Sequence, residues 1–237
     1  MAEKSGIKPA GRSPYLLLYN TSLALGWAYV MYLTVSTALE KGKDHVYEVA
    51  ELPLKIVQTA AIMEVLHSAI GLVRSPVMIT ATQVASRIWI LWGVVIAVPS
   101  VTKQAFPLFS AGGQDIEINV VSLLSAWSLS EIIRYGFFAA KEMGNPPYFM
   151  LWLRYTGFIV LYPIGVSSEL AMLWFALPTI KESKMWNLDM PNSLNFAFNY
   201  YTFCILGAAA YLPGFPQLYF YMLKGRKRAL APKPKTS

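Results

Sequence analysis

A tyrosine and a glutamate lie within a long apolar run, in the stretch LYPIGVSSE (residues 161–169). Tyr162 and Glu169 are seven residues apart, so on a helix they lie close to one face, about 10 Å apart along the axis. A phenol and a carboxylate can each donate or accept a proton, which suits acid–base catalysis. The separation excludes a direct hydrogen bond in a straight helix, but a small substrate group could lie between the two side chains.

The residues around this pair allow more than one interpretation. Pro163 predicts a kink, because it removes a backbone hydrogen bond from the helix. Ser167 and Ser168 could orient the carboxylate of Glu169 or bond back to their own helix. Tyr162 by itself is also compatible with an ordinary core or interfacial tyrosine. Glu169 is harder to explain structurally, because no basic residue lies near it in the sequence.

Other polar residues within apolar stretches are few, and a charge at membrane depth is costly enough that it usually faces the bundle interior and marks function. They are Lys55, Glu64, His67, Gln83, Arg87, Glu131, Arg134 and Arg154. Glu131 and Arg134 have i, i+3 spacing, as do Glu64 and His67, and this spacing favours contact on one helix face.

Two explanations of these charges remain open. They could form ion pairs between helices that hold a bundle together. Alternatively, the arginines could form a cationic mouth for an anionic substrate group, because the planar guanidinium donates two parallel hydrogen bonds to phosphate. Arg74, Arg87, Arg134 and Arg154 are all expected in the cytosolic half of the protein.

The composition is that of a membrane protein. Of the 237 residues, 55% are hydrophobic and 14% are charged, whereas a soluble domain carries about a quarter charged residues. Six apolar stretches approach or exceed the roughly 20 residues that cross a bilayer. They lie near residues 15–38, 53–73, 77–99, 117–140, 148–178 and 194–222. The sequence therefore predicts an all-α bundle of six transmembrane helices.

Lysine and arginine are distributed unevenly between the two sides of this bundle. Eleven lie on the side of the termini and five on the other, and the more basic side of a membrane protein is cytosolic. We therefore expect a cytosolic N-terminal segment (1–14), a membrane domain (15–223) and a basic cytosolic tail (224–237). Lys233 and Lys235 are spaced as in a dilysine retrieval signal of the endoplasmic reticulum, although a solvated tail near anionic lipid is the alternative.

Several classes of site are not expected from this sequence. It has two histidines, His45 and His67, and one cysteine, Cys204, so neither a metal site nor a disulfide is predicted. It contains no glycine-rich phosphate loop and no G-x-S-x-G elbow. The sixth residue after Cys204 is Ala210, where a cysteine-dependent phosphatase has arginine. The basic residues give little support to nucleic-acid binding, and we expect no cofactor.

Five stretches together are similar to one family. They read PLKIVQTAAIMEVLHSAIGLVRSP, QVASRIWILWG, WSLSEIIRYGFFA, WLRYTGFIVLYPIGVSSE and MPNSLNFAFNYY. In this order, and over residues 15–228, the chain resembles the very-long-chain (3R)-3-hydroxyacyl-CoA dehydratases, once called protein-tyrosine-phosphatase-like proteins, and its plant members most of all. The family has six spans and cytosolic termini in the endoplasmic reticulum membrane.

The resemblance implies a hydro-lyase that converts a (3R)-3-hydroxyacyl-CoA to the trans-2-enoyl-CoA, the third step of very-long-chain fatty acid elongation. The catalytic tyrosine and glutamate of the family fall on Tyr162 and Glu169, and which is the acid stays open. Its other important polar positions fall on Glu64, Gln83, Arg87 and Arg134, and we add Arg154 as a further candidate for CoA binding. Expected partners are the acyl-CoA, membrane lipid and the condensing enzyme, ketoacyl reductase and enoyl reductase of elongation.

Two other functions are kept as alternatives. The first is a catalytically silent adaptor or lipid-binding component of the elongase complex, which could have lost Tyr162 or Glu169, yet both are present. The second is a proton-coupled carrier, because buried carboxylates also serve in proton relays. A carrier is expected to have internal repeats, and the sequence has no evident repeat.

Overall fold

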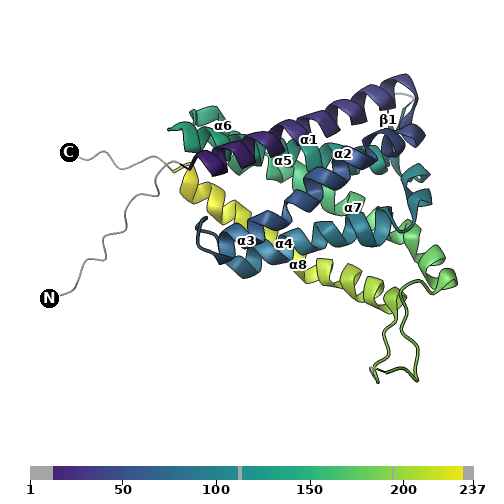
Figure 1. Ribbon diagram of the computed structural model, residues 1–237. Helices are drawn as coiled ribbons and strands as arrows, with labels where there is room; N and C mark the ends of the chain where they lie inside the picture. The colour runs from purple at the N-terminus through teal and green to yellow at the C-terminus, as the bar shows by residue number, and fades with distance from the viewer. Residues whose placement is uncertain (1–12, 112–113, 194, 232–237) are drawn as a thin grey trace, which may run out of the picture.

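The computed structural model describes residues 13–111, 114–193 and 195–231, and it is mostly helical (Figure 1). In chain order the α-helices are α1 (Pro14–Glu40), α2 (Val46–Ala60), α3 (Ile62–Ala69), α4 (Val77–Ile88), α5 (Val120–Met143), α6 (Tyr148–Thr156), α7 (Phe158–Ser183) and α8 (Tyr200–Ala229). A π-helical segment, Trp89–Val95, directly continues α4. Short 3-10 helices occupy Lys43–His45 and Pro99–Lys103, and β1 (Phe106–Ala111) pairs antiparallel with β2 (Gln114–Ile118).

Polar caps define where the long helices begin. The Ser13 hydroxyl accepts a hydrogen bond from the backbone N–H of Leu16 (3.3 Å), and Pro14 occupies the first helical position of α1. Both features are typical of helix N-termini. Before α5, Asn119 and Ser122 form a reciprocal capping box, which satisfies backbone N–H groups that the helix itself leaves unpaired.

The core of the bundle lies between α1, α2, the π-helical segment, α5 and α7. α1 packs against both α2 and α5, α5 packs against α7, and α7 packs against α8. Large side chains that are fully buried in this core include Trp27 from α1, Leu91 from the π-helical segment and Met172 from α7. Figure 1 shows the start of α1 and the end of α8 at one end of the bundle, with the hairpin at the other.

The outer surface of the bundle is apolar. Within the part of the chain that the structure describes, four helices are long and apolar enough to cross a membrane: α1, α4 with its π-helical continuation, α7 and α8. Their outer faces expose large apolar side chains, such as Leu39 on α1 (83% exposed) and Leu212 on α8 (79%). Exposed apolar surface of this kind fits lipid better than water, and it indicates a multi-pass membrane protein.

The boundaries of several predicted spans differ from those of the helices. The predicted span 53–73 is two helices, α2 and α3, which meet at Ala61. The predicted span 148–178 is interrupted at Gly157, between α6 and α7, while α7 continues through Pro163. α8 runs from Tyr200 to Ala229, so the predicted basic tail begins as helix, because cations in the last turn interact favourably with the helix dipole.

Trp89 brings α8 close to the π-helical segment. Its indole N–H donates to the hydroxyl of Tyr200 (3.0 Å), and that hydroxyl donates to the carbonyl of Gly93 (2.8 Å). The Trp89 ring lies directly against Gly207 on α8, where an added Cβ would come within 2.4 Å of it. Because only glycine allows this approach, Gly207 sets how closely α8 packs on the rest of the bundle.

Candidate active site

Glu169 lies buried in the middle of α7, where two side chains from other helices hold its carboxylate. The indole N–H of Trp127, on α5, donates to Oε1 (2.8 Å). The hydroxyl of Tyr211, on α8, donates to Oε2 (2.8 Å). Each carboxylate oxygen has two acceptor sites, so both oxygens can still accept a further proton or hydrogen bond.

The serines that precede Glu169 do not orient it. Ser168 is fully buried and lies in hydrogen-bond contact with Ser122 of α5 (2.8 Å between hydroxyl oxygens), and Ser167 is exposed. The prediction that these serines could hold the carboxylate is therefore wrong. Trp127 takes that place, because packing of α5 against α7 brings its indole to Glu169.

Tyr162 lies two turns before Glu169 on α7, in a stack of three aromatic rings. Its ring is parallel to that of Phe215 on α8 (centroids 5.1 Å apart, 2° between planes) and nearly parallel to that of Tyr219 (6.5 Å, 14°). Among the described residues its hydroxyl has no hydrogen-bond partner. It lies within electrostatic range of both Glu169 and Arg87, so the candidate acid and base share one region of the bundle.

Four of the predicted charged residues form a network between α3, α4 and α5. Glu131 accepts from Arg87 and from Arg134, and Arg134 also binds both oxygens of Glu64 (2.5 and 2.7 Å). The hydroxyl of Tyr135 donates to the same Glu64 carboxylate. The predicted contact between Glu131 and Arg134 is confirmed, and ion pairs do join helices in this bundle. Arginine matches such carboxylates because its fork donates to two oxygens at once.

The network and the candidate acid–base pair are joined through Trp127. The guanidinium of Arg87 lies over the Trp127 ring, with Cζ 5.9 Å from the ring centroid, while the indole N–H of Trp127 binds Glu169. Arg87 therefore contacts the network through Glu131 on one side and approaches Glu169 on the other. The two clusters, which are far apart in the sequence, form one polar region inside the bundle.

The other predicted residues lie outside this cluster of contacts. Gln83 is exposed on α4, and the guanidinium of Arg154 lies over the rings of Phe137 (5.5 Å) and Phe138 (4.4 Å). The i, i+3 spacing of Glu64 and His67 does not produce a pair among the described residues. Instead, His67 lies in hydrogen-bond contact with the hydroxyl of Tyr15 (2.8 Å), and Glu64 binds Arg134. Lys55 forms an ion pair with Glu51 (2.5 Å).

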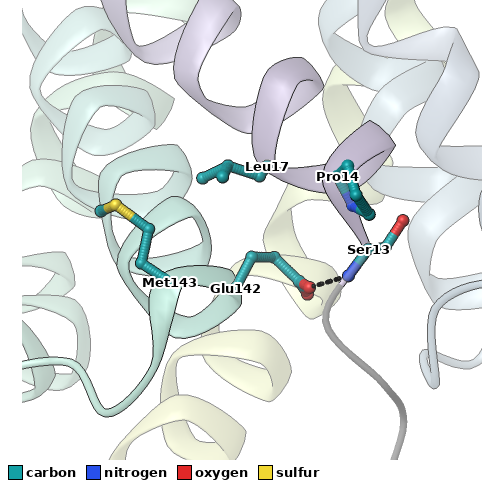
Figure 2. A pocket seen from close by; sticks show the side chains of 5 residues that line it. All are labelled: Ser13, Pro14, Leu17, Glu142 and Met143. Atoms are coloured by element: carbon teal, nitrogen blue, oxygen red, sulfur yellow. Dashed lines mark hydrogen bonds between the residues drawn. The ribbon is translucent and has the colours of Figure 1, made fainter.

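A surface hollow, separate from the acid–base pair, lies near the start of α1. It is lined by Ser13, Pro14, Leu17, Glu142 and Met143 (Figure 2). The backbone N–H of Ser13 donates to Glu142 Oε2 (2.9 Å), as Figure 2 shows. Glu142 follows Glu131 by eleven residues on α5, about 16 Å along the helix. This hollow therefore lies beside the start of α1 and away from the acid–base pair.

Trp127 and Tyr211 are the two residues that sequence reasoning missed. Both lie in apolar runs, where an aromatic residue is most often part of a core or an interfacial belt. Each is 42 residues from Glu169 in the sequence, so no local spacing links them to it. One chemical signal could have found them. A buried carboxylate needs hydrogen-bond donors, and tryptophan and tyrosine are residues of apolar runs whose side chains carry a donor.

The family model for "Protein tyrosine phosphatase-like protein, PTPLA" matches residues 58–232. The chain belongs to this family. The matched residues include all of the polar network, Trp127, Tyr162, Glu169 and Tyr211. Cys204 does not have the surroundings of a cysteine-dependent phosphatase nucleophile. It is fully buried in α8, and Ala210 stands where such a phosphatase has arginine.

PTPLA relatives from plant, worm and human align over most of this chain. "Very-long-chain (3R)-3-hydroxyacyl-CoA dehydratase PASTICCINO 2" from Arabidopsis thaliana is 44% identical over 96% of the chain and 97% of its own length. "Very-long-chain (3R)-3-hydroxyacyl-CoA dehydratase hpo-8" from Caenorhabditis elegans is 46% identical over 91% and 94%. "Very-long-chain (3R)-3-hydroxyacyl-CoA dehydratase 2" from Homo sapiens is 40% identical over 92% and 81%. No solved structure matches the chain.

Proposed function

We infer that this PTPLA-family protein is a very-long-chain (3R)-3-hydroxyacyl-CoA dehydratase, which releases water from its substrate to give the trans-2-enoyl-CoA. The observation that carries this inference is the 44% identity to the Arabidopsis dehydratase across 96% of the chain. The assay is enoyl-CoA formation by the purified protein in detergent. We expect turnover of a long-chain (3R)-3-hydroxyacyl-CoA and far slower turnover of the (3S) isomer, and a protein inactive on both would contradict the inference.

We propose that Tyr162 and Glu169 carry out the elimination. In our scheme Glu169 removes the proton from C2, the C2–C3 double bond forms, and the C3–O bond breaks as Tyr162 protonates the departing hydroxyl. After the product leaves, Glu169 releases its proton to water and Tyr162 takes one up from water, so both residues return to their starting states and the net products are the enoyl-CoA and one water. Two observations support this assignment: both oxygens of Glu169 accept hydrogen bonds, and the Tyr162 hydroxyl has no partner among the described residues.

We propose that Arg87 and Arg154 bind the CoA end of the substrate. Among the described residues, the Arg87 guanidinium donates only to Glu131, so it retains N–H groups for a phosphate or for the thioester carbonyl. The guanidinium of Arg154 lies on two phenylalanine rings and has no ion pair among the described residues. A cation held on an aromatic face keeps its donors free for an anion.

We propose a supporting part in binding for the other three predicted residues. Arg134 and Glu64 bind each other at 2.5 and 2.7 Å, so they hold in place the network to which Arg87 also belongs. Gln83 is exposed on α4, one turn before Arg87, and could donate to the substrate beside it. The apolar surface of the bundle would take the fatty tail.

Replacing Arg87 with lysine tests this binding site. Lysine keeps the charge opposite Glu131 but loses the fork that binds phosphate, so we expect KM to rise roughly tenfold with a smaller change in kcat. The matched control is Arg228→Lys, at an exposed position near the end of α8, which should leave both parameters unchanged. An unchanged KM in a folded Arg87→Lys protein would remove Arg87 from the site.

We propose that the protein crosses the endoplasmic reticulum membrane six times, with residues 1–14 and 224–237 in the cytosol. The two further spans would be α2 with α3, and α5. α5 carries Glu131, Arg134, Lys141 and Glu142, and these charges lower its mean hydropathy. The arrangement is supported by the excess of lysine and arginine on one side and by the start of α1 and the end of α8 at one end of the bundle (Figure 1).

A protease-protection experiment tests this orientation. A tag placed after Ser237 should be removed when protease is added to sealed microsomes, because the proposed tail is cytosolic. A tag inserted in the segment between α7 and α8 should be protected until detergent is added. The opposite pattern would reverse the orientation and place the arginines away from cytosolic CoA. The dilysine signal at Lys233 and Lys235 lies outside the described residues, and it stays a proposal, as do the elongation enzymes as partners.

A further inference from the structure

We propose that α8 positions both members of the acid–base pair: Tyr211 orients the carboxylate of Glu169, and Phe215 orients the ring of Tyr162. This inference rests on the proposed dehydratase function and adds two positioning residues to it. Tyr211 and Phe215 lie four residues apart, so they share one face of α8 in successive turns. That face contacts both residues of the pair on α7.

The contact between Tyr211 and Glu169 fixes one end of the carboxylate. Trp127 holds Oε1 from α5 and Tyr211 holds Oε2 from α8, each at 2.8 Å. The terminal torsion of a glutamate is otherwise broad, so two donors from opposite sides determine which acceptor sites remain for the substrate proton. A carboxylate held by one donor alone could rotate away from that geometry.

The contact between Phe215 and Tyr162 fixes the phenol in a different way. The two rings are parallel within 2°, with centroids 5.1 Å apart, and no hydrogen bond competes to direct the Tyr162 hydroxyl among the described residues. Ring stacking therefore determines where the hydroxyl points. Tyr219 contacts both rings, with its centroid 5.7 Å from that of Phe215 and 6.5 Å from that of Tyr162.

α8 depends on such contacts for its own placement. Only 6% of its most apolar 18-residue stretch is buried inside the bundle, and the helix contains Pro213 and Pro216. Each proline lacks an N–H and removes one hydrogen bond from the helix. A helix at the edge of the bundle, weakened at two positions, needs side-chain contacts to hold a face in register with α7. The contacts between α8 and the acid–base pair are those of Tyr211 with Glu169 and of Phe215 and Tyr219 with Tyr162.

Tyr211→Phe removes the donor to Glu169 and keeps the ring. We expect kcat to fall roughly tenfold or more, since a hydrogen bond to a charged group has about that effect, with KM within about twofold because Tyr211 is not assigned to CoA binding. The control is Tyr221→Phe on the same helix, where the side chain is 63% exposed; it should be unchanged. Normal kcat for Tyr211→Phe would overturn the inference for this residue.

A double substitution separates positioning from a general loss of structure. In the Glu169→Gln protein, Tyr211→Phe should have little further effect on kcat, because residues that act through one group are not additive. A full tenfold loss in that background would mean that Tyr211 acts elsewhere and would overturn the inference. Full activity of Glu169→Gln alone would instead contradict the proposed catalytic role, so the two failures are distinguishable.

Substitutions that change the side-chain shape of Phe215 test its stacking contact with Tyr162. Phe215→Leu loses the parallel ring and should lower kcat several-fold. Phe215→Tyr keeps the ring and should leave kcat near that of the unchanged protein, because the stacking geometry is retained. Phe220→Leu, at a side chain that is 60% exposed on α8, is the control for loss of an aromatic ring. Equal kcat for Phe215→Leu and Phe215→Tyr would overturn the role of Phe215.

Discussion

Glu169→Gln and Tyr162→Phe are each expected to lower kcat by roughly 10²-fold or more, because acid–base catalysis by a positioned group contributes about that factor. Both changes nearly preserve side-chain volume, so the packing of α7 should survive. KM should change much less, since neither residue is proposed to hold CoA. The double variant should lose less than the product of the two single losses, as expected for groups that act in one step.

Two controls accompany this experiment. Glu182→Gln makes the same chemical change at an exposed position near the end of α7, and Tyr148→Phe does so at a tyrosine that is 66% exposed at the start of α6. Both should retain normal turnover. The measurement is enoyl-CoA formation by purified, monodisperse proteins. Near-normal kcat in both site variants would remove Tyr162 and Glu169 from the catalytic step, whereas no turnover even in the unchanged protein would favour the adaptor alternative.

Glu131→Gln is expected to lower the free energy of unfolding by about 3–5 kcal/mol, because removing one partner of a buried ion pair leaves the opposite charge uncompensated. Glu131 is 2% exposed and is the carboxylate that Arg87 and Arg134 share. The stability loss should therefore exceed that of most substitutions in the bundle. It is measured by denaturant unfolding in mild detergent.

A second substitution shows whether the network is the cause. Changing Arg87 to Met in the Glu131→Gln protein removes the charge that lost its ion-pair partner, whereas Arg134 keeps Glu64, and it should recover part of the lost stability. Glu40→Gln, at the exposed end of α1, should have almost no effect, as expected for a surface position. A Glu131→Gln protein as stable as the unchanged one would mean that Glu64 is sufficient for Arg134 and that water or lipid headgroups satisfy Arg87.

Much of this protein could be predicted from its sequence. Long apolar runs must form helices in a membrane, because every backbone N–H and C=O needs a partner there. The positions of α1, α4, α7 and α8 follow from that requirement. The spacing of Tyr162 and Glu169 on one helix, and of Glu131 and Arg134, is also local, so it could be deduced from helix geometry alone.

Only the tertiary structure decided which groups complete the site. The donors to Glu169, Trp127 and Tyr211, come from α5 and α8, each 42 residues away in the sequence, and the nearby Ser168 turns to α5 instead. The helices break at Ala61 and Gly157, while α7 is continuous through Pro163. These outcomes depend on how whole helices pack, because a buried polar group takes whichever donor the packing brings within hydrogen-bond distance, and no periodicity within one helix contains that information.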